Sequence, residues 1–133
     1  MSNISRYNAK DTTLIVDGVY YTAIGEDGIS WEKEEAYFET AVGCQGDIVK
    51  SEINNDIHTL TVALQVTSPQ LSHAIGLKDR KEPFSIWAIN KELGLKLGGS
   101  KANIKEMPEI ALGSEAEDIE IAFTVFDGAV TKE

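Results

Sequence analysis

The feature that most constrains the fold is the segment 54–77, NNDIHTLTVALQVTSPQLSHAIGL, in which a polar turn, a long alternating stretch and a helix-forming stretch follow one another. Between Ile57 and Val66 the residues alternate in the way that a β-strand with one buried side requires. The face expected to be buried carries His58, Leu60, Val62, Leu64 and Val66, and the opposite face carries Ile57, Thr59, Thr61, Ala63 and Gln65. This segment predicts a sheet-forming chain.

A helix is expected to follow this strand, from Ser68 to Leu77. The Ser68 hydroxyl can cap its first turn, and Pro69 suits the first helical position, where its missing N–H costs nothing. We expect the helix to pack on the outside of the sheet. Helical spacing gives it one apolar stripe, formed by Leu71, Ala74 and Ile75.

Alternation and turn residues predict further strands along the rest of the chain. The expected strands are Thr12–Asp17, Val19–Ile24, a strand containing Ile29 and Trp31, Tyr37–Val42, Asp47–Ile53, Phe84–Ile89, Leu93–Gly99, Ala102–Met107 and Ile119–Phe126. The buried face of the last strand is expected to carry Ile119, Ile121, Phe123 and Val125. Turns are expected at Gly25–Gly28, Gly43–Gly46 and Gly98–Gly99. No alternating βα pattern appears. The sequence therefore predicts a mainly β fold, an antiparallel β-sandwich or partly closed β-barrel with one flanking α-helix.

The length of 133 residues fits one domain spanning 1–133. Residues 1–10 are polar and without periodicity, so we expect a flexible arm that a partner orders, and 129–133 are expected to be a polar tail. The longest apolar runs are far too short to cross a bilayer, and no secretory signal opens the chain, so no membrane association is expected.

The charge balance limits the classes of partner. The formal net charge is −10 and the sequence pI is about 4.6, which argues against nucleic-acid binding by neutralisation of phosphates. A surface of this sign would instead suit a passage through which DNA slides without sticking. The single cysteine, Cys44, cannot form an internal disulfide and fits a protein made in a reducing cytosol.

Candidate catalytic and metal-binding groups are scattered. His58 and His73 have no second ligand at zinc spacing, and Asn54–Asp56 lack the spacing of a calcium loop. The stretch Gly94–Lys101 lacks the Walker ending, so it predicts a glycine-rich hairpin and not a phosphate site. The acids Glu32, Glu34, Glu35 and Glu39 suit a solvated strand face better than a glycosidase pair. We predict no enzymatic activity, cofactor or metal.

The expected hairpin around Gly43–Gly46 is unusual because apolar residues occupy both of its faces. One domain core cannot bury both faces, so this pattern indicates burial against a neighbouring subunit. The residues predicted to form that subunit interface are Phe38, Val42, Gly43, Gly46, Ile48, Ile53 and Asn55.

A series of short motifs resembles the tail tube proteins of contractile-tailed bacteriophages. They are VDG at 16–18, VG-x-x-G-D at 42–47, NND at 54–56, TLTVALQVTSP at 59–69 with the helix after it, PFSIWAIN at 83–90 and KEMPEI at 105–110. The resemblance extends over roughly 7–128 and consists of turn and core positions. Related architectures occur in phage-derived tailocins and in the type VI secretion tube.

The resemblance implies a virion structural protein that is made in the bacterial cytoplasm and self-assembles into hexameric rings. The rings would stack into a tube inside a contractile sheath on a baseplate, and DNA would pass through the lumen without specific binding. Acidic residues expected to face that lumen are Glu32, Glu34 and Glu52. The chain departs from the family in having few basic residues for an oppositely charged sheath.

Two alternatives stay open. A small β-barrel binding module for a basic protein partner would remain monomeric at high concentration. An enzyme that uses the carboxylates between Glu32 and Glu39 would lose its activity on single Glu→Gln changes.

Overall fold

The computed structural model describes residues 8–108, 110 and 112–132. Most of the predicted arm, residues 1–7, lies outside this range, and its end forms a short 3-10 helix, η1 (Ala9–Asp11). One α-helix, α1 (Leu71–Leu77), follows the sixth strand. The strands are β1 (Thr12–Val16), β2 (Val19–Tyr21), β3 (Ile24–Lys33), β4 (Phe38–Val42), β5 (Ile48–Glu52), β6 (His58–Leu64), β7 (Phe84–Asn90), β8 (Leu95–Glu106), β9 (Ile119–Val125) and β10 (Ala129–Lys132).

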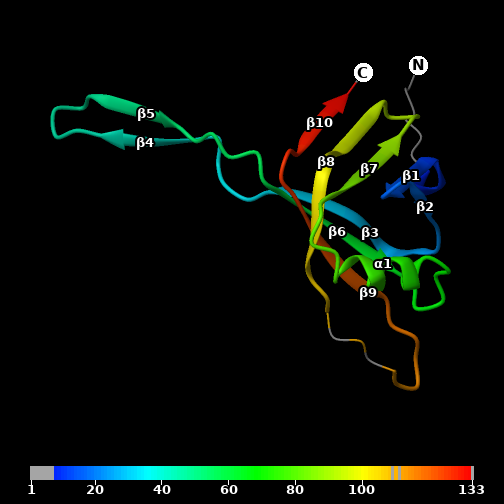
Figure 1. Ribbon diagram of the computed structural model, residues 1–133. Coiled ribbons are helices and arrows are strands. Elements are labelled where there is room, and N and C mark those ends of the chain that lie inside the picture. The colour runs from blue at the N-terminus through cyan, green and yellow to red at the C-terminus, as the bar shows by residue number, and fades with distance from the viewer. Residues whose placement is uncertain (1–7, 109, 111, 133) are drawn as a thin grey trace, which may run out of the picture.

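The main sheet is strongly curved and nearly closed (Figure 1). Its strand order is β2-β1-β7-β8-β9-β6-β3, with β10 paired to the first half of β8, and the pairings are antiparallel. The two ends of this order, β2 and β3, follow each other directly in the sequence. The predicted fold class, mainly β with a partly closed barrel and one helix, is confirmed.

The interior of the barrel is the hydrophobic core. Strands β6 and β9 contribute the faces that alternation predicts, including Leu60, Val62, Ile121 and Phe123, each fully buried. Phe123 meets the ring of Phe84 edge-on, with 6.1 Å between the ring centroids. Burial of such side chains is the main favourable contribution to folding.

The helix differs from its prediction in two respects. It begins at Leu71 and not at Ser68. The Ser68 hydroxyl donates to the Thr22 carbonyl at 2.9 Å and accepts from the Gln70 amide at 3.4 Å, so it ties the link before the helix to the end of β2. Its buried residues are Ala74 and Leu77, whereas the predicted Ile75 is exposed. Both buried residues belong to the core cluster.

Two predicted turns are also wrong, because their glycines lie within strands. The segment around Gly28 is part of β3, where the pairing with β6 shifts register between Ile24 and Ile29. β8 runs without interruption through Gly98. This position excludes any side chain, because its φ is +135° and an added Cβ would overlap the Ile86 carbonyl. The chain instead reverses between β7 and β8 near Gly94, where φ is +66°. The expected polar tail forms β10 as far as Lys132.

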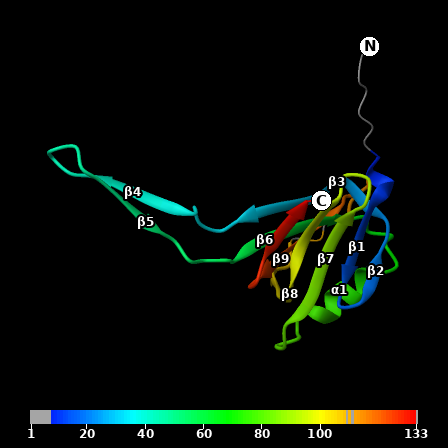
Figure 2. The same cartoon turned by 90° about the horizontal axis from the view of Figure 1, so that it is seen from above.

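Strands β4 and β5 form a separate two-stranded sheet. Figures 1 and 2 show this hairpin extending away from the barrel in both views, joined to β3 and β6 by two short links. The predicted hairpin and its turn at Gly43–Gly46 are confirmed.

Candidate functional site: the projecting hairpin

The hairpin offers apolar side chains on both of its faces. Directly paired residues share a face, so one face carries Phe38, Thr40 and Val42 opposite Glu52, Lys50 and Ile48. The other face carries Ala41 opposite Val49 and Glu39 opposite Ser51. Every residue of the two strands is exposed, including Val42 at 69% and Ile48 at 71%. A solvated two-stranded ribbon has no core of its own, so this element lacks the burial that stabilises other sheets.

The tip is a tight turn. The amide of Gly43 donates to the Asp47 carbonyl at 2.8 Å, and the amide of Gly46 donates to the Gly43 carbonyl at 2.9 Å. Gly46 has a φ of +88°, which glycine adopts without strain. Cys44 sits exposed in this turn as a free thiol. The turn therefore presents a small, smooth tip flanked by Val42 and Ile48.

The base of the hairpin is held by backbone bonds between the two links. The amide of Glu34 donates to the Ile57 carbonyl at 3.0 Å, and the amide of Ile53 donates to the Tyr37 carbonyl at 2.9 Å. The side chain of Asn55 accepts from the Ile57 amide at 2.9 Å. These bonds fix the direction in which the hairpin leaves the barrel.

A stacked ring pair lies where the hairpin joins the barrel. The rings of Trp31 and His58 are nearly parallel, 16° apart with centroids at 4.5 Å. The Asp56 carbonyl lies 2.8 Å from Nδ1 of His58 and also accepts from the Gly128 amide at 3.1 Å. A Cβ at Gly128 would overlap the His58 ring, so this close packing needs glycine there. His58, predicted to be buried, is 7% exposed and serves to support the hairpin.

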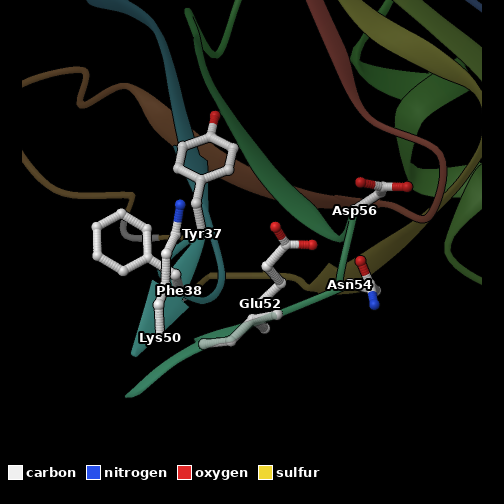
Figure 3. A pocket seen from close by; sticks show the side chains of 7 residues that line it. Tyr37, Phe38, Lys50, Glu52, Asn54 and Asp56 are labelled. Carbon is white, nitrogen blue, oxygen red and sulfur yellow. The ribbon is translucent and has the colours of Figure 1, made fainter. Parts of the chain in front are cut away.

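A shallow hollow runs along the base of the hairpin (Figure 3). Its volume is about 360 Å³, and it is lined by Tyr37, Phe38, Lys50, Glu52, Ile53, Asn54 and Asp56. The Lys50 ammonium lies 4.7 Å from the centre of the Phe38 ring, an arrangement that keeps this ring partly covered in a single copy. The hollow is open to solvent.

The predicted site residues fall into two groups. Phe38, Val42 and Ile48 are exposed on one face of the hairpin, with Gly43 and Gly46 at its tip. Ile53 and Asn55 are partly buried at the base. The acids expected in the lumen, Glu32, Glu34 and Glu52, are all exposed. Glu32 lies on the solvent face of β3, Glu34 in the link after β3, and Glu52 at the end of β5 opposite Phe38.

Two hydrogen-bonded groups outside the hairpin, at Tyr21 and at Asp127, connect parts of the barrel. The Tyr21 hydroxyl lies 2.7 Å from Nδ1 of His73, and burial, aided by the Asp17 carboxylate, raises the tyrosine pKa. Burial also raises the pKa of Asp127, but hydrogen bonds from Ser100 and from the Lys101 amide outweigh it and leave this pKa below its usual value. The Asp127 bonds fasten the corner between β9 and β10 to β8.

Within the described ranges, no group of three His, Cys, Asp or Glu side chains is arranged to hold a metal ion. None of the helices described there has the length and apolar character that a membrane span needs.

A second apolar surface was not predicted as a site. On the solvent side of the barrel, Tyr20, Ile15 and Trp87 lie opposite one another across β2, β1 and β7, and Ile89 lies two residues further along β7. The ammonium of Lys96 lies 4.3 Å from the centre of the Trp87 ring. These five residues are called the outer wall below. The only sequence signal for the outer wall was a tryptophan in a strand, which is equally typical of a core.

No family model matches this sequence, and no curated protein matches it. Solved structures do match in fold. The sheath/tube terminator of the extracellular contractile injection system PVC contains a chain with a TM-score of 0.65 and 13% identity, over 98% of both chains. A chain of the tube-terminating cap of the anti-feeding prophage matches with a TM-score of 0.69 and 11% identity, over 100% of this chain and 95% of the other. A chain of the PVC sheath–tube complex matches with a TM-score of 0.61 and 12% identity, over 92% of this chain and 88% of the other.

This protein has the fold of contractile injection system components. The resemblance to tail tube proteins is therefore confirmed at the level of fold, over nearly the whole length of the chain.

Proposed function

We propose that this protein is a structural subunit of the tube of a contractile tail or related injection system, and that it acts through self-assembly and not through catalysis. The observation that supports this most directly is the free-standing β4–β5 hairpin, which exposes apolar side chains on both faces. A protein that worked alone would bury or lack such an element, because exposed strand edges and apolar patches favour association.

A closed ring requires a heterologous contact, in which one surface of a subunit meets a different surface of the next. The hairpin is suited to be one of those surfaces, because it projects beyond its own barrel (Figure 2). We propose that six copies form a ring and that rings stack through the hairpin, with Phe38, Val42, Gly43, Gly46, Ile48, Ile53 and Asn55 at or beside the contacts. The partners would be tube, sheath and baseplate proteins of a tail assembled in the bacterial cytoplasm.

The lumen would be negatively charged. The net charge of −10 repels nucleic-acid phosphates, and the exposed acids Glu32, Glu34 and Glu52 are the proposed lining residues. Such a lining would let DNA move through without binding.

A second candidate is the ring that ends the tube. Two of the similar structures contain a tube terminator or a terminating cap, and both match at least 98% of this chain. A repeating tube subunit and a terminal subunit can share one barrel, and they differ in whether a ring accepts another ring of the same protein on its exposed side.

Size-exclusion chromatography and negative-stain electron microscopy of the purified protein over a concentration series test both roles. Tubes that lengthen with concentration support the repeating subunit, whereas single rings that do not grow support the terminator. A monomer at every concentration would defeat both and favour a binding module for a basic protein partner. A deletion within Gly43–Gly46 is the matched variant. Polymerisation that is unchanged by this deletion would contradict the proposal that the hairpin forms the stacking contact.

A further inference from the structure

The outer wall is an apolar surface that the core does not account for. Ile15, Trp87 and Ile89 alternate with the buried residues of β1 and β7, so they point away from the interior. They are absent from the set of side chains packed on the core. Tyr20, beside Ile15, is 63% exposed. Aromatic side chains on a sheet surface are typical anchors of protein interfaces.

The β7–β8 part of the outer wall has an excess of basic residues, whereas the chain as a whole is acidic and Asp17 lies beside the β1–β2 part. In the β7–β8 segment, 84–106, the basic residues Lys91, Lys96, Lys101 and Lys105 outnumber the acids Glu92 and Glu106. Lys96 lies over the Trp87 ring itself. The β7–β8 part of this surface therefore combines the half-buried side chains Trp87 and Ile89 with positive charge, in a chain whose net charge is −10.

The hairpin has the complementary character. Its strands and links, 34–57, contain the acids Glu34, Glu35, Glu39, Asp47, Glu52 and Asp56 against the single basic residue Lys50. Its apolar side chains Val42, Ile48 and Val49 are at least 60% exposed. It points away from its own outer wall in both views, so the two surfaces can meet only between copies (Figures 1 and 2).

We propose that the outer wall of one copy is the surface that receives the β4–β5 hairpin of the next copy. Val49 would lie against Trp87 and Ile15, and the carboxylate of Glu39, on the same face of the hairpin, would lie near Lys96. This contact is heterologous, since the hairpin and the outer wall are different surfaces, so it leaves each copy with one of each for its other neighbour. The inference rests on the proposed function, and it adds the acceptor surface.

Cross-linking through the native thiol tests the contact. Cys44 is the only cysteine and lies at the exposed hairpin tip. A tagged Cys44→Ser variant carrying Tyr20→Cys or Ile89→Cys is mixed as a minority with wild-type protein, assembled, and treated with a flexible bis-maleimide. Two matched controls carry Ser30→Cys or Glu120→Cys, which are exposed on the β3 and β9 part of the same solvent face.

We expect the outer-wall variants to give a tagged cross-linked dimer, and the control variants to give none. If the protein assembles but Cys44 links only to the control positions, or to no position, the outer wall is not the surface that receives the hairpin. The proposed function would then still stand. Wild-type protein that never assembles would defeat the proposed function, and this inference with it.

A charge exchange gives a second readout that does not depend on the cross-linker. Lys96→Glu is expected to raise the concentration needed for assembly about tenfold, because it places like charges across the contact. Glu39→Lys in the same chain is expected to restore most of that loss. Circular dichroism of each monomer checks that the barrel is intact, and assembly that is insensitive to Lys96→Glu contradicts the proposal.

Discussion

The double substitution Val42→Ser with Ile48→Ser is the sharpest probe of the hairpin. These residues face each other across β4 and β5 next to the tip, and they are 69% and 71% exposed in the single copy. Complete burial of such a side chain stabilises by about 1.5–3 kcal/mol. Since roughly two thirds of each side chain remains to be buried, the pair would contribute about 2–4 kcal/mol to a subunit contact.

This magnitude sets the expected effect on assembly. Each 1.4 kcal/mol is about a factor of ten in an equilibrium constant, so the concentration at half-assembly should rise roughly 30-fold to 1,000-fold. The same change should leave the isolated barrel intact, because exposed positions outside the core usually change the free energy of unfolding by less than about 0.5 kcal/mol.

Light scattering over a concentration series, with negative-stain images of the same samples, measures the assembly. Thermal unfolding measures the stability of the monomer. Leu112→Ser is the matched control, because this leucine is 86% exposed but lies in the loop between β8 and β9. If the double variant assembled within about threefold of the wild-type concentration, a difference of only about 0.6 kcal/mol, the argument from the exposed hairpin would be refuted.

Three further predictions concern the barrel. Gly98→Ala should cost about 3 kcal/mol or more in urea unfolding, because its Cβ would overlap the Ile86 carbonyl at a φ of +135°, while Gly113→Ala, in open space, should be nearly neutral. Ala23→Gly should raise the free energy of unfolding by about 0.5 kcal/mol, and with it the melting temperature slightly, because a φ of 56° is strained for alanine; a lower melting temperature would contradict this. The folded-state pKa of Asp127 is lowered, so its stabilising effect is present above the ordinary value of 3.8 and is lost as the pH falls through the lower folded pKa. Asp127→Asn should therefore weaken the pH dependence of unfolding in that acidic range, and acid titrations that coincide for the two proteins would exclude this role.

The elements that sequence predicts well are those whose signals are local. Alternation in β6 and β9 identifies Leu60 and Phe123 as core residues, because a sheet with one buried side repeats every second residue. The Gly43–Gly46 turn joins two stretches of strand-forming residues, so the hairpin also follows from the sequence. Its apolar residues on both faces predict contact with a partner without any knowledge of the barrel.

The errors arise where a residue acts through a distant partner. Gly98 resembles a turn glycine, but it is needed because β7 brings the Ile86 carbonyl against it. Ser68 has the sequence context of a helix cap, yet its hydroxyl bonds to the Thr22 carbonyl, 46 residues away. Residues 129–132 have no strong strand pattern and form β10 only because β8 offers a free edge there. Local propensity carries no information about such contacts.

The outer wall illustrates a different limit of sequence. Along β7, Phe84, Ile86 and Ala88 alternate with Trp87 and Ile89, so both faces are apolar and periodicity cannot tell which one is buried. The curvature of the sheet decides, by placing Ile86 in the core and leaving Trp87 under Lys96 on the solvent side. In β7, as in the hairpin, a strand that is apolar on both faces has more apolar surface than one barrel can bury. In the proposed contact, two copies cover the hairpin of one and the outer wall of the other, where the acidic hairpin would meet Lys96.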